Sequence, residues 1–329
     1  MAANRYKGII DVVNESLTTN SEWENRFRGY ARGIKENGSI YENEKTRFRV
    51  NPPLYCYTNV SSVKDNSRDY DIRFCGQSIA TAFVRKDGVS ISTKNAISFG
   101  IKTSLEKEKW QSKESTKFRA AFTKELHKEE RGKSREHHVE NVLLAEFGKT
   151  KSTDKKLCNI QPIKLCGLFF QMPTPLSASI GEPTYAKKGG GIDILARVRH
   201  KDNSVRICVM ELKDENTEKE SPEKTMEQAV AYATFIARLL RSKSGNDWYD
   251  LFGFGTNVPE ILTIDVAITM PYDEKRNENF EAYDKIVVCE KTYLKLYALY
   301  FQRDKNGKVK EFVGSLKNDM MPHNRKPKH

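Results

Sequence analysis

Two acids and a lysine stand near the outer ends of a stretch that has the pattern of two β-strands joined by a polar turn. The segment GGGIDILARVRHKDNSVRICVMELK, residues 189–213, has Asp193 near its start and Glu211 and Lys213 at its end. Acids and lysines are rarely buried in strands unless they are paired. Two explanations are open: these side chains lie at solvated strand ends, or the fold gathers them into a site.

The pairing of the two strands decides between these explanations. A turn at HKDNS, centred on Asp202, gives the opposed apolar pairs Ile192–Leu212, Ile194–Met210 and Ala196–Cys208. One face of the hairpin is then apolar throughout, as a sheet that covers a core requires. The same register sets Asp193 opposite Glu211, and Lys213 lies two residues further on the same face. A slip by one residue would spoil both the apolar face and the acidic pair.

The paired acids and the lysine together predict a metal-dependent hydrolase. Opposed residues have Cβ atoms about 4.5–5.5 Å apart, so two ionised carboxylates there repel each other unless a cation binds. Oxygen ligands of this kind suit Mg²⁺ or Mn²⁺, and the backbone carbonyl of Leu212 is a further candidate ligand. A neighbouring lysine can orient and deprotonate an attacking water or stabilise the developing charge. The alternative is a surface hairpin in which Lys213 forms a salt bridge with Asp193 or Glu211.

The elements around this hairpin alternate in a recognisable order. A helix is expected over residues 134–147, because SREHHVENVLLAEF ends at Gly148, a common residue after a helix. The expected strands cover residues 164–173, 191–199 and 205–213, a helix begins at Ser221-Pro222, and a further strand covers residues 261–270. This α-β-β-β-α-β order predicts an α/β fold with a mixed sheet, in which the last strand–helix–strand step is a right-handed crossover between parallel strands.

These residues and this order resemble the PD-(D/E)XK nuclease superfamily, which has the restriction-endonuclease-like fold. Asp193 corresponds to the family's first strand acid, and Glu211-Leu212-Lys213 corresponds to its (D/E)-x-K motif. Residues 190–193 resemble the G-x-x-D of the RecB-like branch, and residues 228–232 resemble its Q-x-x-x-Y. The family pattern has a proline before the first acid, and this chain has no proline before Asp193. Many members of the family also lack it. The resemblance covers about residues 130–300.

The resemblance implies roles for two helices. Gln228, on the helix that follows the hairpin, would reach back and position Lys213 or the water. The segment RGKSREHHVENVLLAEFG resembles the KGxxxE helix start of archaeal Holliday-junction resolvases, which makes Glu136 a metal ligand and Glu140 the reserve. Glu136 has an alternative role as an acid favoured by the helix dipole. Outside candidates for the same ligand position are His137 and His138, whose alternative is a solvated helix start.

The lysines and glycines before Asp193 suggest contact with a nucleic-acid backbone. Lys187 and Lys188 are candidate phosphate contacts, and Gly190 allows a close approach of the backbone. We assign Tyr232 to the same nucleic-acid-binding group. The alternatives are a flexible loop with solvated lysines, and a helix interior in which Tyr232 has a packing role.

We expect two domains, divided near residue 125. Residues 1–125 form an α+β domain, with helices over residues 6–18 and 21–36 followed by a β-rich segment. Arginines alternate with tyrosines and phenylalanines in that segment, a combination that can grip a nucleic-acid strand by charge and stacking. An ordinary β-rich core is the alternative. Residues 126–329 form the nuclease-like domain.

Composition agrees with a polyanionic partner but does not specify it. The chain has 329 residues, 38% hydrophobic, and its 56 Lys and Arg against 44 Asp and Glu give a net charge of +12. Nucleic acid is therefore favoured over a membrane surface. The six cysteines form no CxxC pair, which disfavours zinc and thioredoxin-like chemistry. No apolar run is long enough for a signal core or a membrane span, so we expect a soluble, cytoplasmic protein with no membrane partner.

The expected function is a Mg²⁺- or Mn²⁺-dependent nuclease that acts on DNA. A different class also fits: a catalytically silent nucleic-acid-binding module on the same fold. A hydrolase acting on RNA or nucleotides is a third reading, and the oligomeric state, including a homodimer, is left open.

Overall fold

The computed structural model describes residues 2–37, 48–62, 68–122, 135–149, 156–178, 181–214, 221–274, 285–305 and 307–322. Its contacts divide the chain into two compact units. The larger unit contains Met1–Asn25, Val142–Ile163 and Met172–His329, and the smaller unit contains Arg26–Asn141 and Lys164–Gln171. Two helices, α2 (Glu22–Asn37) and α6 (Arg135–Phe147), contribute residues to both units.

The larger unit is built around a mixed sheet with the strand order β15-β16-β14-β13-β12-β6, in which β17 also pairs with β16. These strands are β6 (Ile160–Pro162), β12 (Ile194–Arg199), β13 (Val205–Leu212), β14 (Leu262–Pro271), β15 (Ile286–Cys289), β16 (Thr292–Arg303) and β17 (Val309–Val313). The helices of this unit include α1 (Ala2–Thr19), α7 (Pro222–Arg241), α8 (Gly245–Leu251) and α9 (Ser315–Asp319). The expected α/β class with a mixed sheet is confirmed at this level.

Of the expected elements, α6, β12, β13, α7 and β14 occur in the order that the sequence predicts. β13 and β14, which α7 connects in sequence, pair in parallel, as expected of a strand–helix–strand step. α7 begins at Pro222, and the Ser221 hydroxyl accepts a hydrogen bond from the backbone N–H of Lys224, which caps the helix.

The first of the three expected strands is wrong in its placement. Residues 164–173 form two short strands, β7 (Phe169–Phe170) and β8 (Met172–Pro173), which lie outside the main sheet. β6 takes the expected place and pairs antiparallel with β12. β7 pairs with a strand of the smaller unit, whereas β8 pairs with β11 (Gly191–Ile192) of the larger unit. The apolar run is therefore divided between two sheets, and the boundary between the units follows Gln171.

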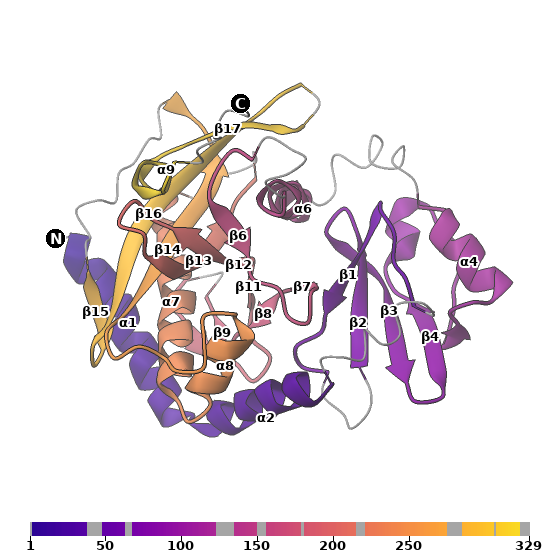
Figure 1. Ribbon diagram of the computed structural model, residues 1–329, viewed down its shortest axis with the longest axis horizontal. Coiled ribbons are helices and arrows are strands. Elements are labelled where there is room, and N and C mark those ends of the chain that lie inside the picture. The colour runs from indigo at the N-terminus through magenta and orange to yellow at the C-terminus, as the bar shows by residue number, and fades with distance from the viewer. Residues whose placement is uncertain are drawn as a thin grey trace, which may run out of the picture. The chain divides into compact units, whose positions relative to one another are not determined.

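The N-terminal helix does not belong with the β-rich segment that follows it, which corrects the expected division at residue 125. α1 lies along α7 (Figure 1) and also contacts β15. Its buried side chains are Tyr6, Ile10, Val13 and Leu17, which recur at helical spacing on one face. Burial of this apolar face against the larger unit outweighs nearness in sequence to the smaller unit.

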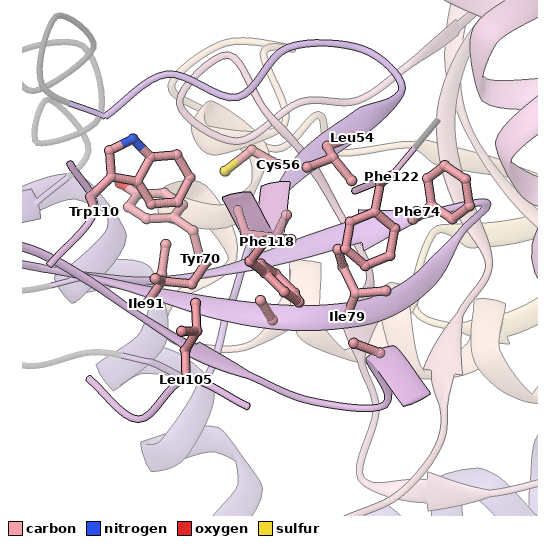
Figure 2. Packing of buried hydrophobic residues seen from close by; sticks show 14 of the residues in the cluster. Leu54, Cys56, Tyr70, Phe74, Ile79, Ile91, Leu105, Trp110, Phe118 and Phe122 are labelled. Carbon is pink, nitrogen blue, oxygen red and sulfur yellow. The ribbon is translucent and has the colours of Figure 1, made fainter. Parts of the chain in front are cut away.

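The smaller unit has its own sheet and core. Its strand order is β5-β4-β3-β2-β1-β7, antiparallel except for the β1–β7 pair. Its strands are β1 (Leu54–Thr58), β2 (Arg68–Phe74), β3 (Gln77–Arg85), β4 (Gly88–Thr93) and β5 (Glu108–Lys109), with the short helices η1 (Ala96–Phe99) and α4 (Lys113–Ala120). Aromatic side chains dominate the core, and Figure 2 shows Trp110, Tyr70, Phe118 and Phe122 among them. A turn between Arg85 and Gly88 joins β3 to β4.

Candidate metal centre

The hairpin register that the sequence predicts is confirmed along β12 and β13. Ile194 pairs with Met210 and Ala196 pairs with Cys208. The expected pair of Ile192 with Leu212 is wrong, since Ile192 pairs with Met172 of β8. The chain bends at Asp193, between β11 and β12, so the strand changes partners at this residue.

Asp193 and Glu211 nevertheless bring their carboxylates together. One oxygen of each lies within 4.8 Å of the other. The backbone N–H of Leu212 donates a hydrogen bond of 2.9 Å to Oδ2 of Asp193. This bond holds the Asp193 side chain in one orientation. At the bend, the Asp193 carboxylate accepts the Leu212 N–H in place of a backbone carbonyl of the neighbouring strand. Both acids are therefore on the same side of the hairpin, as the predicted register requires.

Lys213 completes a buried group of charges at the end of β13. Its Nζ lies 3.3 Å from Oε1 of Glu211, and the two residues are 8% and 2% exposed. The salt bridge that the surface-hairpin alternative expects is thus present, but it is buried. Burial of charges is costly unless they are closely compensated, and here each charge has the other as its partner.

The strand end that carries these residues is well anchored. The backbone N–H of Lys213 donates to the carbonyl of Thr269 on β14 at 3.0 Å, and β13 is hydrogen-bonded on both sides along its length. In an extended strand, the N–H and C=O of one residue point to the same edge. Since the N–H of Leu212 points to Asp193, its carbonyl also points to that edge, which agrees with its expected role as a further ligand.

The two acids of α6 have different surroundings. Glu136 is exposed in the first turn, within the part of α6 that belongs to the smaller unit, and its role as a ligand stays a prediction. Glu140 is 2% exposed and lies 3.7 Å from Nη1 of Arg73 on β2. Its carboxylate is also 3.8 Å from Nδ1 of His137. Glu140 thus faces Arg73 and His137 within the smaller unit, and its place as the reserve ligand stays a prediction.

The two histidines at the start of α6 are both accessible to some degree. His137 has a side chain that is 50% exposed, and a hydrogen bond to Glu140 raises its pKa above the ordinary value of 6.5. His138 is partly buried. Their candidacy as ligands stays a prediction, although a raised pKa favours the protonated form, which cannot bind a metal.

Tyr232 is not available to a nucleic acid, which corrects that assignment. Its side chain is 1% exposed in the interior of α7. A Cβ placed on Gly190 would lie 2.4 Å from the Tyr232 hydroxyl oxygen, so the glycine is needed for packing within the protein. Lys187 and Lys188 are exposed, and their contact with phosphate stays a prediction. Gln228, one turn before Tyr232, is partly buried, and its positioning role is likewise untested.

Several aromatic and basic residues of the smaller unit are buried or paired, so they do not form the exposed nucleic-acid-binding surface that the sequence suggested. Tyr70 and Phe74 are in the core, and Arg68 is 1% exposed. Arg73 pairs with Asp71 and Glu140, and Arg85 pairs with Asp69, so these guanidinium groups are already engaged by carboxylates; the shortest of these N–O distances are 2.7 and 2.6 Å, to Asp71 and Asp69. The ordinary-core alternative is favoured for these residues, and a recognition role for the unit as a whole stays a prediction.

A second buried group of charges, which the sequence did not indicate, follows β12. His200 Nε2 lies 2.6 Å from Oδ2 of Asp265, and both residues are almost fully buried. Burial raises the pKa of Asp265, while the hydrogen bond from His200 opposes that rise. Nδ1 of His200 is 3.3 Å from Asp319 at the end of α9. This network ties α9 to the sheet.

All six cysteines are free, and Cys56, Cys158 and Cys208 are buried. The other three cysteines are partly exposed. Burial raises the pKa of Cys158 to about 12, which makes it an unreactive thiol at neutral pH.

Comparison of the chain with protein-family models, curated proteins and solved structures gives no match. Within the residues that the structure describes, no helix combines the length and apolar character needed to cross a membrane. The function is therefore argued from the chemistry of Asp193, Glu211 and Lys213.

Proposed function

We propose that this protein is a nuclease that hydrolyses phosphodiester bonds with Mg²⁺ or Mn²⁺, with DNA as the favoured substrate. The observation that carries the proposal is the meeting of Asp193 and Glu211 from adjacent strands, with oxygens within 4.8 Å, beside the buried ammonium of Lys213. A resemblance to the PD-(D/E)XK superfamily, with the restriction-endonuclease-like fold, is part of the proposal. The order α6-β6-β12-β13-α7-β14 supports it.

The donor atoms fit a hard divalent cation. Asp193 and Glu211 offer carboxylate oxygens, and the Leu212 carbonyl points to the same strand edge; Mg²⁺ and Mn²⁺ prefer such all-oxygen sets. No cysteine belongs to the group, which disfavours a soft metal. We include Glu136 as a third acid because it opens the helix that precedes the three strands, as the first-helix acids of the resembled family do.

Each residue of the site has a distinct task. Asp193 and Glu211 would hold the cation, which when bound would polarise the scissile phosphate and lower the pKa of water. Lys213 orients the attacking water and stabilises the charge that develops on the phosphate. Lys213 is 8% exposed, and its ion pair with Glu211 keeps the buried ammonium group in place. Gln228 on α7 positions Lys213 or the water.

The net charge of +12 supports a polyanionic substrate. Lys187 and Lys188 precede Asp193 by six and five residues in sequence, and both are exposed. They are the proposed contacts to the phosphates that flank the scissile bond. Contacts of this kind are independent of sequence, so the proposal names a phosphodiester backbone and leaves the target sequence unassigned.

A cleavage assay with supercoiled, linear and single-stranded DNA tests the proposal. The parent protein should cut at least one of these substrates when Mg²⁺ or Mn²⁺ is present, and chelation should stop it. Lys213→Ala should abolish cleavage, while Lys201→Ala, which removes an exposed lysine from the turn of the same hairpin, should cut like the parent. A Lys213→Ala protein that cuts as well as the parent would refute the assigned mechanism.

Calorimetry with Mn²⁺ separates a nuclease from a silent nucleic-acid-binding module. Binding that is lost in Asp193→Ala supports the nuclease. DNA binding without any cation binding would instead favour the silent module. Competition between DNA and RNA in the same cleavage assay decides which nucleic acid is the substrate.

A further inference from the structure

The segment that leads into Asp193 is held by a closely packed set of backbone contacts. The backbone N–H of Gly190 donates to the carbonyl of Leu176 at 2.7 Å, and the backbone N–H of Thr174 donates to the carbonyl of Gly190 at 2.8 Å. The Thr174 hydroxyl donates to the same Gly190 carbonyl at 3.1 Å. Gly190 is therefore fixed on both its polar groups, three residues before Asp193.

α7 packs against this segment through one hydroxyl group. A Cβ on Gly190 would lie 2.4 Å from the oxygen of Tyr232 and 3.3 Å from its Cζ, whereas the next atom, the Leu176 carbonyl oxygen, is 3.6 Å away. Real Cβ atoms do not approach a heavy atom to 2.4 Å, so only glycine fits under this hydroxyl without a shift. Tyr232 is 1% exposed, which leaves its ring little room to move.

The chain from Gly190 to the metal site is short and paired. Ile192 pairs with Met172 of β8, the chain bends at Asp193, and the Asp193 carboxylate receives the Leu212 N–H. A displacement of Gly190 is therefore transmitted along two residues of paired strand to the bend that aims the carboxylate. Metal ligands depend on such supporting contacts for their orientation.

We propose that the close packing of Gly190 under Tyr232 sets the placement of Asp193: the glycine lets the segment lie against α7, and a side chain there would push the segment away from the Tyr232 hydroxyl. This inference rests on the proposed function, because it assigns Asp193 to a cation site. It differs from a nucleic-acid contact, since Tyr232 acts through the protein backbone and does not touch the substrate. The Q-x-x-x-Y segment would thus serve the site from two turns of α7, Gln228 from one and Tyr232 from the next.

A double-mutant cycle tests the contact. Gly190→Ala should weaken Mn²⁺ binding about 10-fold or more, the size usual for groups that support a ligand, and should lower the cleavage rate constant. Tyr232→Phe keeps the ring and should change both quantities little. The combined variant Gly190→Ala/Tyr232→Phe should recover most of the lost affinity, because the added methyl then faces Cζ at 3.3 Å and no longer meets the hydroxyl. Gly8→Ala, at a glycine of α1 with no heavy atom within 4 Å of the added Cβ, is the matched control.

Two readouts separate positioning from other roles. The thermal midpoint of each variant shows whether the measurements were made on folded protein, and DNA affinity without metal should be unchanged in every variant. Parent-like Mn²⁺ binding by Gly190→Ala, or a combined variant no better than Gly190→Ala, would overturn the inference. Weaker metal-free DNA binding by Tyr232→Phe would also overturn it, in favour of a substrate contact. If the parent itself binds no Mn²⁺, it is the proposed function that fails.

Discussion

The carboxylate of Asp193 accepts a hydrogen bond from the backbone N–H of Leu212, the residue between Glu211 and Lys213. One acid is thereby locked to the strand that carries the other acid and the lysine. The bond spans 19 residues of sequence and fixes the relative placement of the three side chains. Preorganisation of this kind is what a cation site and its neighbouring lysine require.

We expect Asp193→Asn to lose cation binding while keeping the fold. The amide oxygen of asparagine can still accept the Leu212 N–H, but the negative charge is gone. Replacement of groups that merely support a ligand costs about 10–100-fold in metal affinity, so loss of a ligand charge should cost at least about 100-fold. Calorimetry with Mn²⁺ checks this. Asp202→Asn, an exposed acid in the turn of the same hairpin, is the control and should bind like the parent.

Glu136→Gln should weaken Mn²⁺ binding without a measurable change in the free energy of unfolding, because Glu136 is exposed. The charge is lost and the size of the side chain is kept, so any effect on binding reports on the carboxylate. Calorimetry and urea unfolding of the same preparation give both quantities. Unchanged affinity in this variant would remove Glu136 from the proposed ligand set.

Arg73→Met should destabilise the protein by about 3–5 kcal/mol, the usual cost of leaving one partner of a buried ion pair uncompensated. Arg73 and Glu140 have side chains that are 12% and 2% exposed, so little solvent screens the remaining acid. Arg85→Met removes a more exposed guanidinium, 36% accessible, from its pair with Asp69 on the same sheet. It should cost no more than about 1 kcal/mol. Urea unfolding compares the two variants, and equal losses would contradict the assignment of Arg73 to a buried group of ion pairs with Asp71 and Glu140.

The His137–Glu140 contact should contribute to stability at acidic pH. Its hydrogen bond raises the folded-state pKa of His137 above 6.5, so folding favours the protonated form. The contribution is therefore full below the unfolded pKa and is lost as pH rises through the folded pKa. Thermal unfolding of the parent and of His137→Gln at pH 5.5 and pH 8.5 measures it. The difference between the two proteins should shrink at the higher pH; a constant difference would show that the charge of His137 is irrelevant.

The periodic parts of this chain could be read directly from its residues. The helices α1, α6 and α7 follow from apolar positions at helical spacing and from Gly148 and Ser221-Pro222 at their ends. The register of β12 with β13 follows from an alternation that only one alignment satisfies. This register already implied that Asp193 and Glu211 meet, because side-chain direction in a strand is fixed by position.

Other features depended on contacts between distant segments, which local patterns do not encode. The run at residues 164–173 is apolar enough for a core strand, yet pairing with two different partners divides it, and β6 takes its place beside β12. Tyr232 was expected to contact the substrate, and only its burial against Gly190 excludes this. The sequence by itself determined which side chains lie on the same strand face, since that depends on local backbone geometry. The tertiary structure alone decided which of them are buried and paired, because burial and pairing depend on residues remote in the chain.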